Sequence, residues 1–175
     1  MQLSTILSTT NLALSAPSLT SEALAASKAY LFLVPGSKST KREHIVGCLI
    51  AQRIKTAMEV AENGTVDVLD NPSLVHVDGG LYCRGVNVPS KCFLYSFVLR
   101  PAPLPTTVGI SRVFVARDHR CKGIGHALLD AMSQTFIHAC PLDPVKGQIA
   151  FSQPTGDGRR LMESWGRGKV RVYEE

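Results

Sequence analysis

Residues 109–131 read GISRVFVARDHRCKGIGHALLDA, and this stretch decides the fold. The apolar run over 110–115 has the composition of a buried strand, and residues 123–138 have the apolar spacing of a helix. Between them lie Gly123 and Gly125, which lack the Cβ atoms that would block backbone amides from approaching a ligand. Because a helix start carries about half a positive charge, the pattern predicts an anion-binding turn that suits a phosphate-bearing cofactor.

The sequence on either side predicts further strands and helices. The expected elements are strands at 30–34, 45–54, 148–152 and 169–173 and a helix at about 157–165. The first two strands are expected to form a hairpin across the polar loop at 38–42. Strands that alternate with helices predict an α/β fold in which at least part of the sheet is parallel.

The length and composition predict one compact domain. The chain has 175 residues, of which 45% are hydrophobic and 19% charged, which is enough apolar material for a real core. We expect a leader and a short helix over 1–28 and the domain over 29–175. Within the domain, short β-like pieces at 66–69, 74–77 and 93–99, broken by Gly, Asn and Pro, predict a variable insertion around 61–108.

Charge, cysteines and hydropathy restrict the function class. The net charge of +5 suits an acidic partner, but no block of five basic residues is present and aromatic residues make up only 6%, so dedicated nucleic-acid binding is disfavoured. The five cysteines form no Cys-x-x-Cys pair, so neither a zinc site nor a disulfide framework is expected. No apolar stretch approaches the roughly 18 residues of a membrane span. We therefore expect an intracellular protein without a metal or membrane.

The glycine turn differs from the nucleotide-binding motifs and resembles another one. It has neither the P-loop spacing nor the Rossmann spacing. The pattern Arg120-x-x-Gly123-x-Gly125 after a strand resembles the acetyl-coenzyme A pyrophosphate loop of the GCN5-related N-acetyltransferases. With GISRVFV at 109–115, IAFSQPTGDG at 149–158 and VGCLIA at 46–51, the chain resembles the sister-chromatid cohesion establishment acetyltransferases, the Eco/ESCO family.

The resemblance implies both a fold and an activity. The fold would be the GCN5-related one, with a mixed, partly parallel central sheet flanked by helices. The activity would be transfer of acetyl from acetyl-CoA to a lysine of a protein, by resemblance the head ATPase subunit of cohesin, in the nucleus, with chromatin reached only through partners. The residues implied to bind the cofactor are Val113, Phe114, Val115, Arg120, Cys121, Lys122, Gly123, Ile124, Gly125, His126, Gln153, Pro154 and Thr155.

Three residues are candidates for the chemistry. A lysine amine has a pKa of about 10.4, so attack on a thioester requires a proton acceptor. Asp130 aligns with a family acid that is usually Glu, although an exposed helical Asp is also an ordinary solvated charge. Gln153 stands where some members have a second acid, and it can orient an amine but cannot accept its proton. Ser111 corresponds to a family serine beside the reaction centre, and it would stabilise the oxyanion or the departing sulfur.

Two alternatives remain open at this stage. The same fold and cofactor could serve a small amine or a protein N-terminus. The chain could also be a catalytically weak acetyl-CoA-binding module, which is favoured by Gln153, by the short N-terminus and by the absence of the family's usual Cys/His zinc finger.

Overall fold

The computed structural model divides the chain into two compact units. The first unit comprises residues 1–53 and 110–143, and the second comprises 54–109 and 144–175. The structure describes residues 3–14, 16–36, 43–59, 75–78, 81–83, 97–99, 103–152, 156–167 and 171–174.

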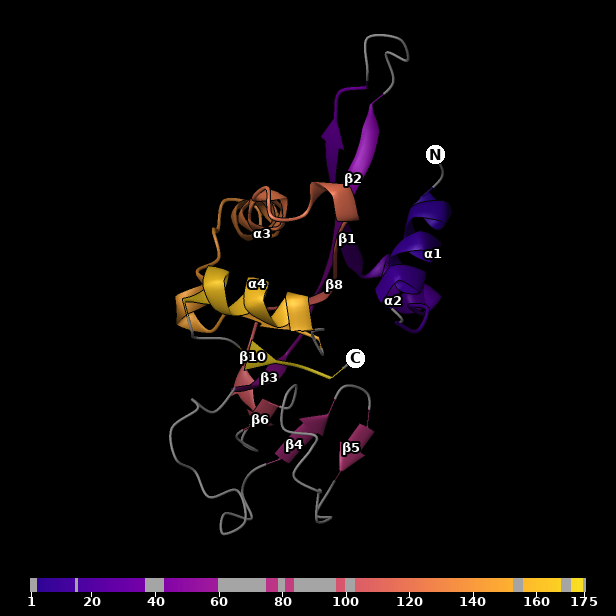
Figure 1. Ribbon diagram of the computed structural model, residues 1–175. Helices are drawn as coiled ribbons and strands as arrows, with labels where there is room; N and C mark the ends of the chain where they lie inside the picture. The colour runs from indigo at the N-terminus through magenta and orange to yellow at the C-terminus, as the bar shows by residue number, and fades with distance from the viewer. Residues whose placement is uncertain are drawn as a thin grey trace. The chain divides into compact units, whose positions relative to one another are not determined.

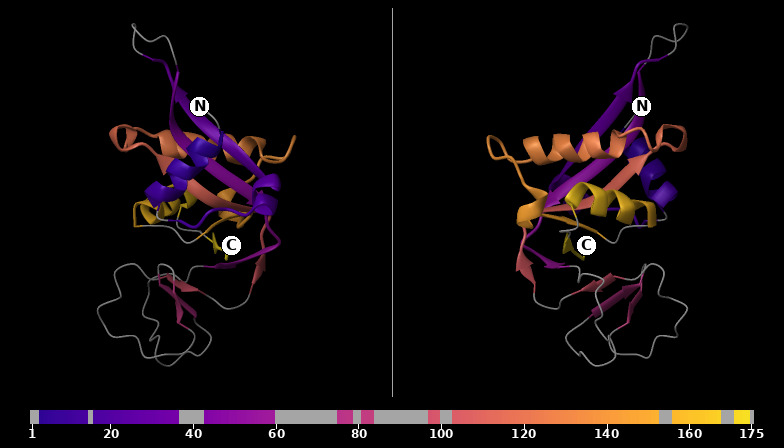
Figure 2. Two further views of the ribbon diagram at one scale, coloured as in Figure 1. Left: turned by 90° about the vertical axis from the view of Figure 1, so that its right-hand side faces the viewer. Right: turned by 60° about the vertical axis from the view of Figure 1, so that its left-hand side comes forward.

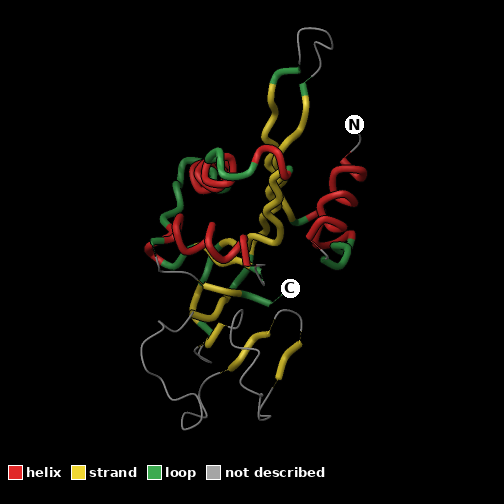
Figure 3. The backbone as a smooth tube through the Cα atoms, viewed as in Figure 1, coloured by secondary structure: helices red, strands yellow, loops and turns green. Residues whose placement is uncertain are grey.

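The first unit is a sheet with helices on both faces (Figure 1). Its elements are α1 (Leu3–Leu14), α2 (Ser21–Ala25), β1 (Ser27–Val34), β2 (His44–Arg53), β8 (Val108–Val115, of which 110–115 lie in this unit), the 3-10 turn η1 (Arg117–His119) and α3 (Ile124–Thr135). The strand order is β1-β2-β8. The strands β1 and β2 pair antiparallel, which confirms the predicted hairpin, and they run side by side in Figure 3.

Strand β2 is buried on both faces, because a helix covers each side of it. On one face Cys48 and Ile50 form a core cluster with Ile6 of α1. On the other face α3 packs across β1 and β2, as both views in Figure 2 show. The predicted apolar stripe of α3 is confirmed as core, since its members are all buried: Ile124, Leu128, Leu129, Met132 and Phe136.

The close approach of α3 to β2 depends on Gly47. A Cβ atom added at this glycine would lie 3.0 Å from Ile124 Cγ2, 3.1 Å from Leu128 Cδ1 and 3.3 Å from Phe32 Cβ. These separations are shorter than ordinary carbon contacts of about 3.5–4.0 Å. The missing side chain therefore sets how near the first two turns of α3 lie to the sheet.

The second unit contains a mixed sheet and a helix. Its elements are β3 (Thr56–Glu59), β4 (Val75–Asp78), β5 (Leu81–Cys83), β6 (Phe97–Leu99), β7 (Leu104–Pro105), the 3-10 turn η2 (Pro144–Lys146), β9 (Ile149–Phe151), α4 (Gly156–Gly166) and β10 (Arg171–Val172). The order β9-β10-β3-β7 combines a parallel pair, β9 with β10, with antiparallel pairs. A separate antiparallel sheet has the order β5-β4-β6.

One arginine ties the second unit together. Arg171 Nη1 donates to the carbonyl of Pro105 at 2.6 Å and to that of Gly147 at 2.7 Å. It also donates to Thr106 Oγ1 at 3.0 Å. Hydrogen bonds from a charged donor are stronger than neutral ones, so this side chain joins β10 to β7 and to the turn before β9.

The predicted elements of the last third are all present, with ends that differ by a few residues. The structure adds elements that the sequence did not predict: helix α1 in the expected leader, strands β3, β5 and β7, and the turns η1 and η2. Of the β-like pieces expected in the insertion, those near 74–77 and 93–99 overlap β4 and β6, and the piece at 66–69 lies outside the described residues.

Adding a methyl group at Gly47 should loosen the packing of α3. We expect Gly47→Ala to lower the free energy of unfolding by about 1–3 kcal/mol, the usual cost of overpacking a core. Thermal unfolding followed by circular dichroism measures the change. Ala29→Val, which enlarges an exposed residue of the same hairpin, is the matched control and should change the melting temperature little. An unchanged melting temperature in Gly47→Ala would show that α3 can shift without cost.

The buried thiol of Cys48 should make stability fall at alkaline pH. Burial raises its pKa, so in the folded protein it stays neutral over a range in which the unfolded thiol ionises. The stability it contributes is therefore complete below the usual thiol pKa of about 8.5 and is lost as pH rises towards the folded-state pKa. Urea unfolding of the wild type and of Cys48→Ala between pH 7 and 10 tests this. The wild type should lose more stability than the variant, and equal losses would contradict the assignment.

Candidate functional site

The glycine turn begins where β8 ends. The amide of Ala116 donates to the carbonyl of Val46 in β2 at 2.8 Å, which fixes the entry to the turn. After η1 the backbone enters the left-handed region twice, at Cys121 with φ of 56° and at Gly123 with φ of 78°. Because glycine has no Cβ atom, it adopts this region with less strain than other residues, so Gly123 favours the conformation of the turn.

The glycine turn leads directly into the N-terminus of α3, whose geometry suits an anion. Gly123 is the N-cap residue and, having no side chain, supplies no cap to the helix. The first N–H groups of a helix have no acceptor within it, and the helix start is electropositive. Ile124 points its side chain into the core, so only its backbone is available to a ligand. Gly123, Ile124, Gly125 and His126, all predicted to bind the cofactor, are thus the cap and opening turn of one helix.

The two basic residues of the turn bond to its own backbone. Arg120 Nε donates to the carbonyl of Val115 at 3.1 Å, and Lys122 Nζ donates to that of Asp118 at 2.8 Å. Both side chains are exposed. They therefore stabilise the turn and keep two positive charges beside the start of α3, whether or not they also contact an anion.

Strand β8 carries Ser111 and three residues that are predicted to bind the cofactor. Those three, residues 113–115, are half-buried at the end of the strand. Ser111 lies deeper in the strand and is only 4% exposed. Its hydroxyl can therefore take part in chemistry only by contacting a group that enters the interior of the protein.

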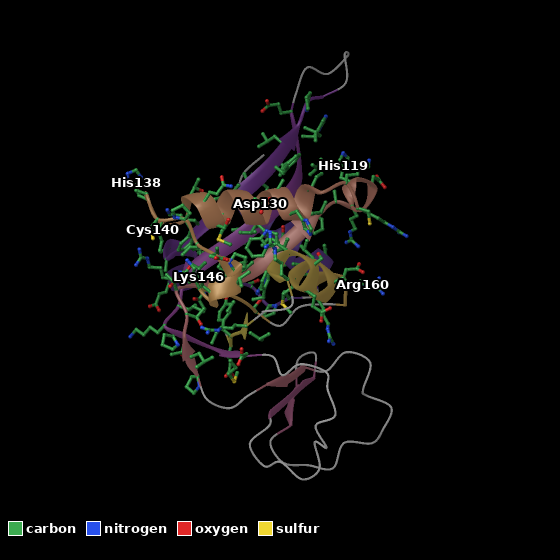
Figure 4. All side chains as sticks on the ribbon, turned by 90° about the vertical axis from the view of Figure 1, so that its left-hand side faces the viewer. His119, Asp130, His138, Cys140, Lys146 and Arg160 are labelled. Carbon is green, nitrogen blue, oxygen red and sulfur yellow. The ribbon has the colours of Figure 1, made fainter. Side chains whose placement is uncertain are left out.

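Asp130 lies on α3 and is exposed, as its position in Figure 4 shows. The apolar stripe of the same helix faces the core, so Asp130 lies on the side of α3 away from that stripe. Its backbone carbonyl accepts a hydrogen bond from Ser133 Oγ at 2.9 Å. The first unit thus contains the glycine turn, Ser111 and Asp130 together.

Three predicted residues belong to the second unit. Gln153, Pro154 and Thr155 lie outside the described residues. On either side of them Phe151 is buried at the end of β9, and Gly156 begins α4. Their assignment to the site stays a prediction.

Sequence reasoning missed two residues that shape the site. Gly47 determines how closely α3 approaches β2, and the sequence feature that could have indicated it is a lone glycine within the apolar run VGCLIA. Arg112 is buried, and its signal is a charged residue within the apolar strand that follows Gly109. Among the described residues, no group of three or more His, Cys, Asp or Glu is arranged to hold a metal ion, and no helix is both long and apolar enough to cross a membrane.

Comparison with known proteins gives the family. The family model of the ESCO1/2 acetyl-transferases matches residues 104–173, which include the glycine turn. The chain is 36% identical to N-acetyltransferase ECO1 of Yarrowia lipolytica over 101 residues, which are 58% of this chain and 34% of that protein. It is 31% identical to N-acetyltransferase ESCO2 of Homo sapiens over 132 residues, which are 75% of this chain and 18% of that protein. The chain belongs to the Eco/ESCO acetyltransferase family.

A solved structure gives the fold. The xEco2 acetyltransferase domain bound to a CoA conjugate superposes with a TM-score of 0.68 at 23% identity, covering 98% of this chain and 82% of that one. The predicted Eco/ESCO family and α/β fold are therefore confirmed. The chain spans about a third or less of the length of the curated Eco/ESCO relatives described above.

Proposed function

We propose that this chain is a protein-lysine N-acetyltransferase that uses acetyl-CoA. The observation that carries the proposal is the left-handed Gly123, which caps α3 without a side chain within the Arg-x-x-Gly-x-Gly pattern. A pyrophosphate fits this place because it is an anion that accepts hydrogen bonds from successive backbone amides. That the relatives are named N-acetyltransferases, and that a CoA conjugate is bound to the solved neighbour, supports the same cofactor.

Different groups of residues would bind different parts of acetyl-CoA. Residues 121–126 would hold the pyrophosphate, and the backbone of 113–115 would pair with the pantetheine arm. Gln153, Pro154 and Thr155 would lie towards the thioester. Bound acetyl-CoA supplies an activated acyl group, and the chain must orient it and exclude water from it.

Different residues would accept the lysine proton and stabilise the negative charge that develops on the acetyl oxygen. The Asp130 carboxylate would take a proton from the lysine ammonium, directly or through one water, so that the neutral amine can attack. The new bond joins the lysine nitrogen to the acetyl carbon, and the bond from that carbon to sulfur breaks. The Ser111 hydroxyl would donate a hydrogen bond to the oxygen that becomes negative. The attacking nitrogen loses its second proton, and the sulfur, which leaves as a thiolate, takes up that proton directly or through water.

The acceptor we propose is the head ATPase subunit of cohesin, in the nucleus. Membership of the Eco/ESCO family supports a role in chromatid cohesion, and the exposed position of Asp130 suits an acceptor lysine carried by a protein. Chromatin would be reached through partners.

One observation favours a second candidate. Gln153 replaces the acid that some family members carry, so the chain would hold one carboxylate fewer for proton transfer. A module that binds acetyl-CoA but transfers acetyl poorly is the function this favours.

A single experiment separates the two candidates. The purified chain is incubated with acetyl-CoA and recombinant cohesin head domain, and acetyl-lysine is located by mass spectrometry. Calorimetry on the same sample measures acetyl-CoA binding. Enzyme-dependent acetyl-lysine is the expected result. Binding without any acetyl-lysine would replace the enzyme with the binding module, and absence of binding would refute both.

Replacing Gly123 should remove cofactor binding through the backbone. A Cβ added at Gly123 meets no described protein atom within 4 Å, so the protein has room for it. The φ of 78° is the obstacle, since a β-branched residue is strongly disfavoured there. We therefore expect Gly123→Val to weaken acetyl-CoA binding by about tenfold or more, measured by calorimetry, as the turn rearranges.

Gly123→Asn is the matched control. Asparagine adopts the left-handed region more readily than valine, so this variant should keep the turn and bind acetyl-CoA more tightly than Gly123→Val. Equal affinities for the wild type and the valine variant would remove the turn from the site.

Asp130→Asn should affect turnover without affecting cofactor affinity. Loss of a general base typically lowers the rate by roughly 10²-fold or more. The turnover number and the dissociation constant of acetyl-CoA are measured on the same preparation. Glu22→Gln removes one exposed carboxylate from α2 and should leave turnover unchanged. Near-normal turnover in Asp130→Asn would assign the proton transfer to another group.

A further inference from the structure

Arg112 is a charged residue buried in the strand that carries Ser111. Its side chain is 5% exposed. Arg112 Nη1 donates to the carbonyl of Ser111 at 2.7 Å, and Nη2 donates to the carbonyl of Pro17 at 3.0 Å. Removing a guanidinium from water is costly unless its donors are bonded, so these two contacts are part of what makes its burial possible.

The two carbonyls belong to segments that are far apart in the sequence. Pro17 lies in the connection between α1 and α2, which cover one face of the sheet (Figure 1). Successive side chains of a strand point to opposite faces. Arg112 therefore points to the face of α1, and Ser111 points to the face that α3 covers.

The bond to the Ser111 carbonyl fixes the peptide plane that follows Ser111. That plane sets the ψ angle of Ser111, so the bond holds the backbone from which the Ser111 side chain extends. The second bond, to Pro17, prevents the guanidinium from turning with the strand. A planar donor that bridges two carbonyls is a geometry that arginine supplies and lysine does not.

We propose that Arg112 is a positioning residue, which holds the backbone of Ser111 so that its hydroxyl meets the acetyl oxygen during transfer. This inference rests on the proposed function. Arg112 acts through Ser111 and touches neither acetyl-CoA nor lysine. It also makes the connection between α1 and α2 part of the support of the site, since the Pro17 carbonyl is the other anchor of the guanidinium.

Arg112→Lys tests the inference, because it keeps the charge and loses the bridge. We expect the turnover number to fall about tenfold, since small misplacements of reacting groups are costly, while the KM for acetyl-CoA changes less than twofold. Arg112→Gln, which is neutral and keeps an amide donor, is the second variant in case the lysine variant does not fold. Thermal unfolding of each variant reports how much of the protein is folded.

Arg171→Lys is the control for a purely structural effect. Arg171 also binds two backbone carbonyls, those of Pro105 and Gly147, but it belongs to the second unit, whereas Ser111 belongs to the first. Arg112→Lys and Arg171→Lys should both lower the melting temperature, and only Arg112→Lys should lower the turnover number of the folded fraction. Equal losses of turnover in the two variants would overturn the positioning role.

A double mutant decides whether Arg112 acts through Ser111. Ser111→Ala alone should lower turnover by roughly 10²-fold, the scale of a lost oxyanion donor. If Arg112 works through the Ser111 hydroxyl, adding Arg112→Lys to Ser111→Ala should cost no further turnover. Independent, multiplicative losses would overturn the inference and leave acetyl transfer by the wild type intact. A wild type that binds acetyl-CoA without transferring acetyl would refute the proposed function, and the positioning role with it.

Discussion

Two successive residues of β2 hold both ends of the glycine turn, and the site depends on this arrangement. The Val46 carbonyl accepts a hydrogen bond from Ala116 where β8 runs into the turn. Gly47, the next residue, gives Ile124 and Leu128 room to pack where the turn runs into α3. The chain between 116 and 124 is thus fixed at both ends to the same place on one strand, although it contains two left-handed residues. A turn that is strained in isolation is held in one conformation by the core on which it rests.

Each of the two units contains an arginine whose side chain connects segments of that unit by donating hydrogen bonds to backbone carbonyls. Arg112 links β8 to the connection between α1 and α2, and Arg171 links β10 to β7 and to the turn after η2. Carbonyls, unlike carboxylates, carry no full charge, so these contacts give directional hydrogen bonds to a charged donor without a buried ion pair. Each arginine therefore fixes local backbone geometry, and in the first unit that geometry is next to Ser111.

The elements that could be predicted from the sequence are those whose apolar residues recur at a regular spacing or that border a distinctive turn. Helix α3 follows from the apolar spacing of Ile124, Leu128 and Met132, and β8 follows from its run of branched and aromatic residues. Helix α1 could not be predicted, because its Ser and Thr residues weaken the apolar pattern, and its helix is stabilised by the packing of Ile6 against Cys48 and Ile50. The burial of Arg112 could not be predicted either, since arginine is usually exposed and its carbonyl partner Pro17 is distant in sequence.

The candidate site was predictable in a different way. Physical reasoning alone predicted the anion-binding turn, because glycines at a strand-to-helix junction allow backbone amides to approach an anion. Ser111 and Asp130 came from resemblance, since nothing in a lone serine or aspartate distinguishes a reactive group from an ordinary one. The structure adds the contrast between them: Ser111 is buried and Asp130 is exposed.

This contrast bears on the kind of acceptor. A buried hydroxyl can meet a small group that enters the interior, such as an acetyl, whereas an exposed carboxylate meets whatever approaches from solvent. A base that assisted a small amine would work best inside a closed pocket, where water is excluded and the amine is held on all sides. An exposed base needs the acceptor itself to bring the surface that covers it. Under the proposed function a lysine carried by a folded protein would do this, because the protein around the lysine would exclude water from Asp130 as it docked.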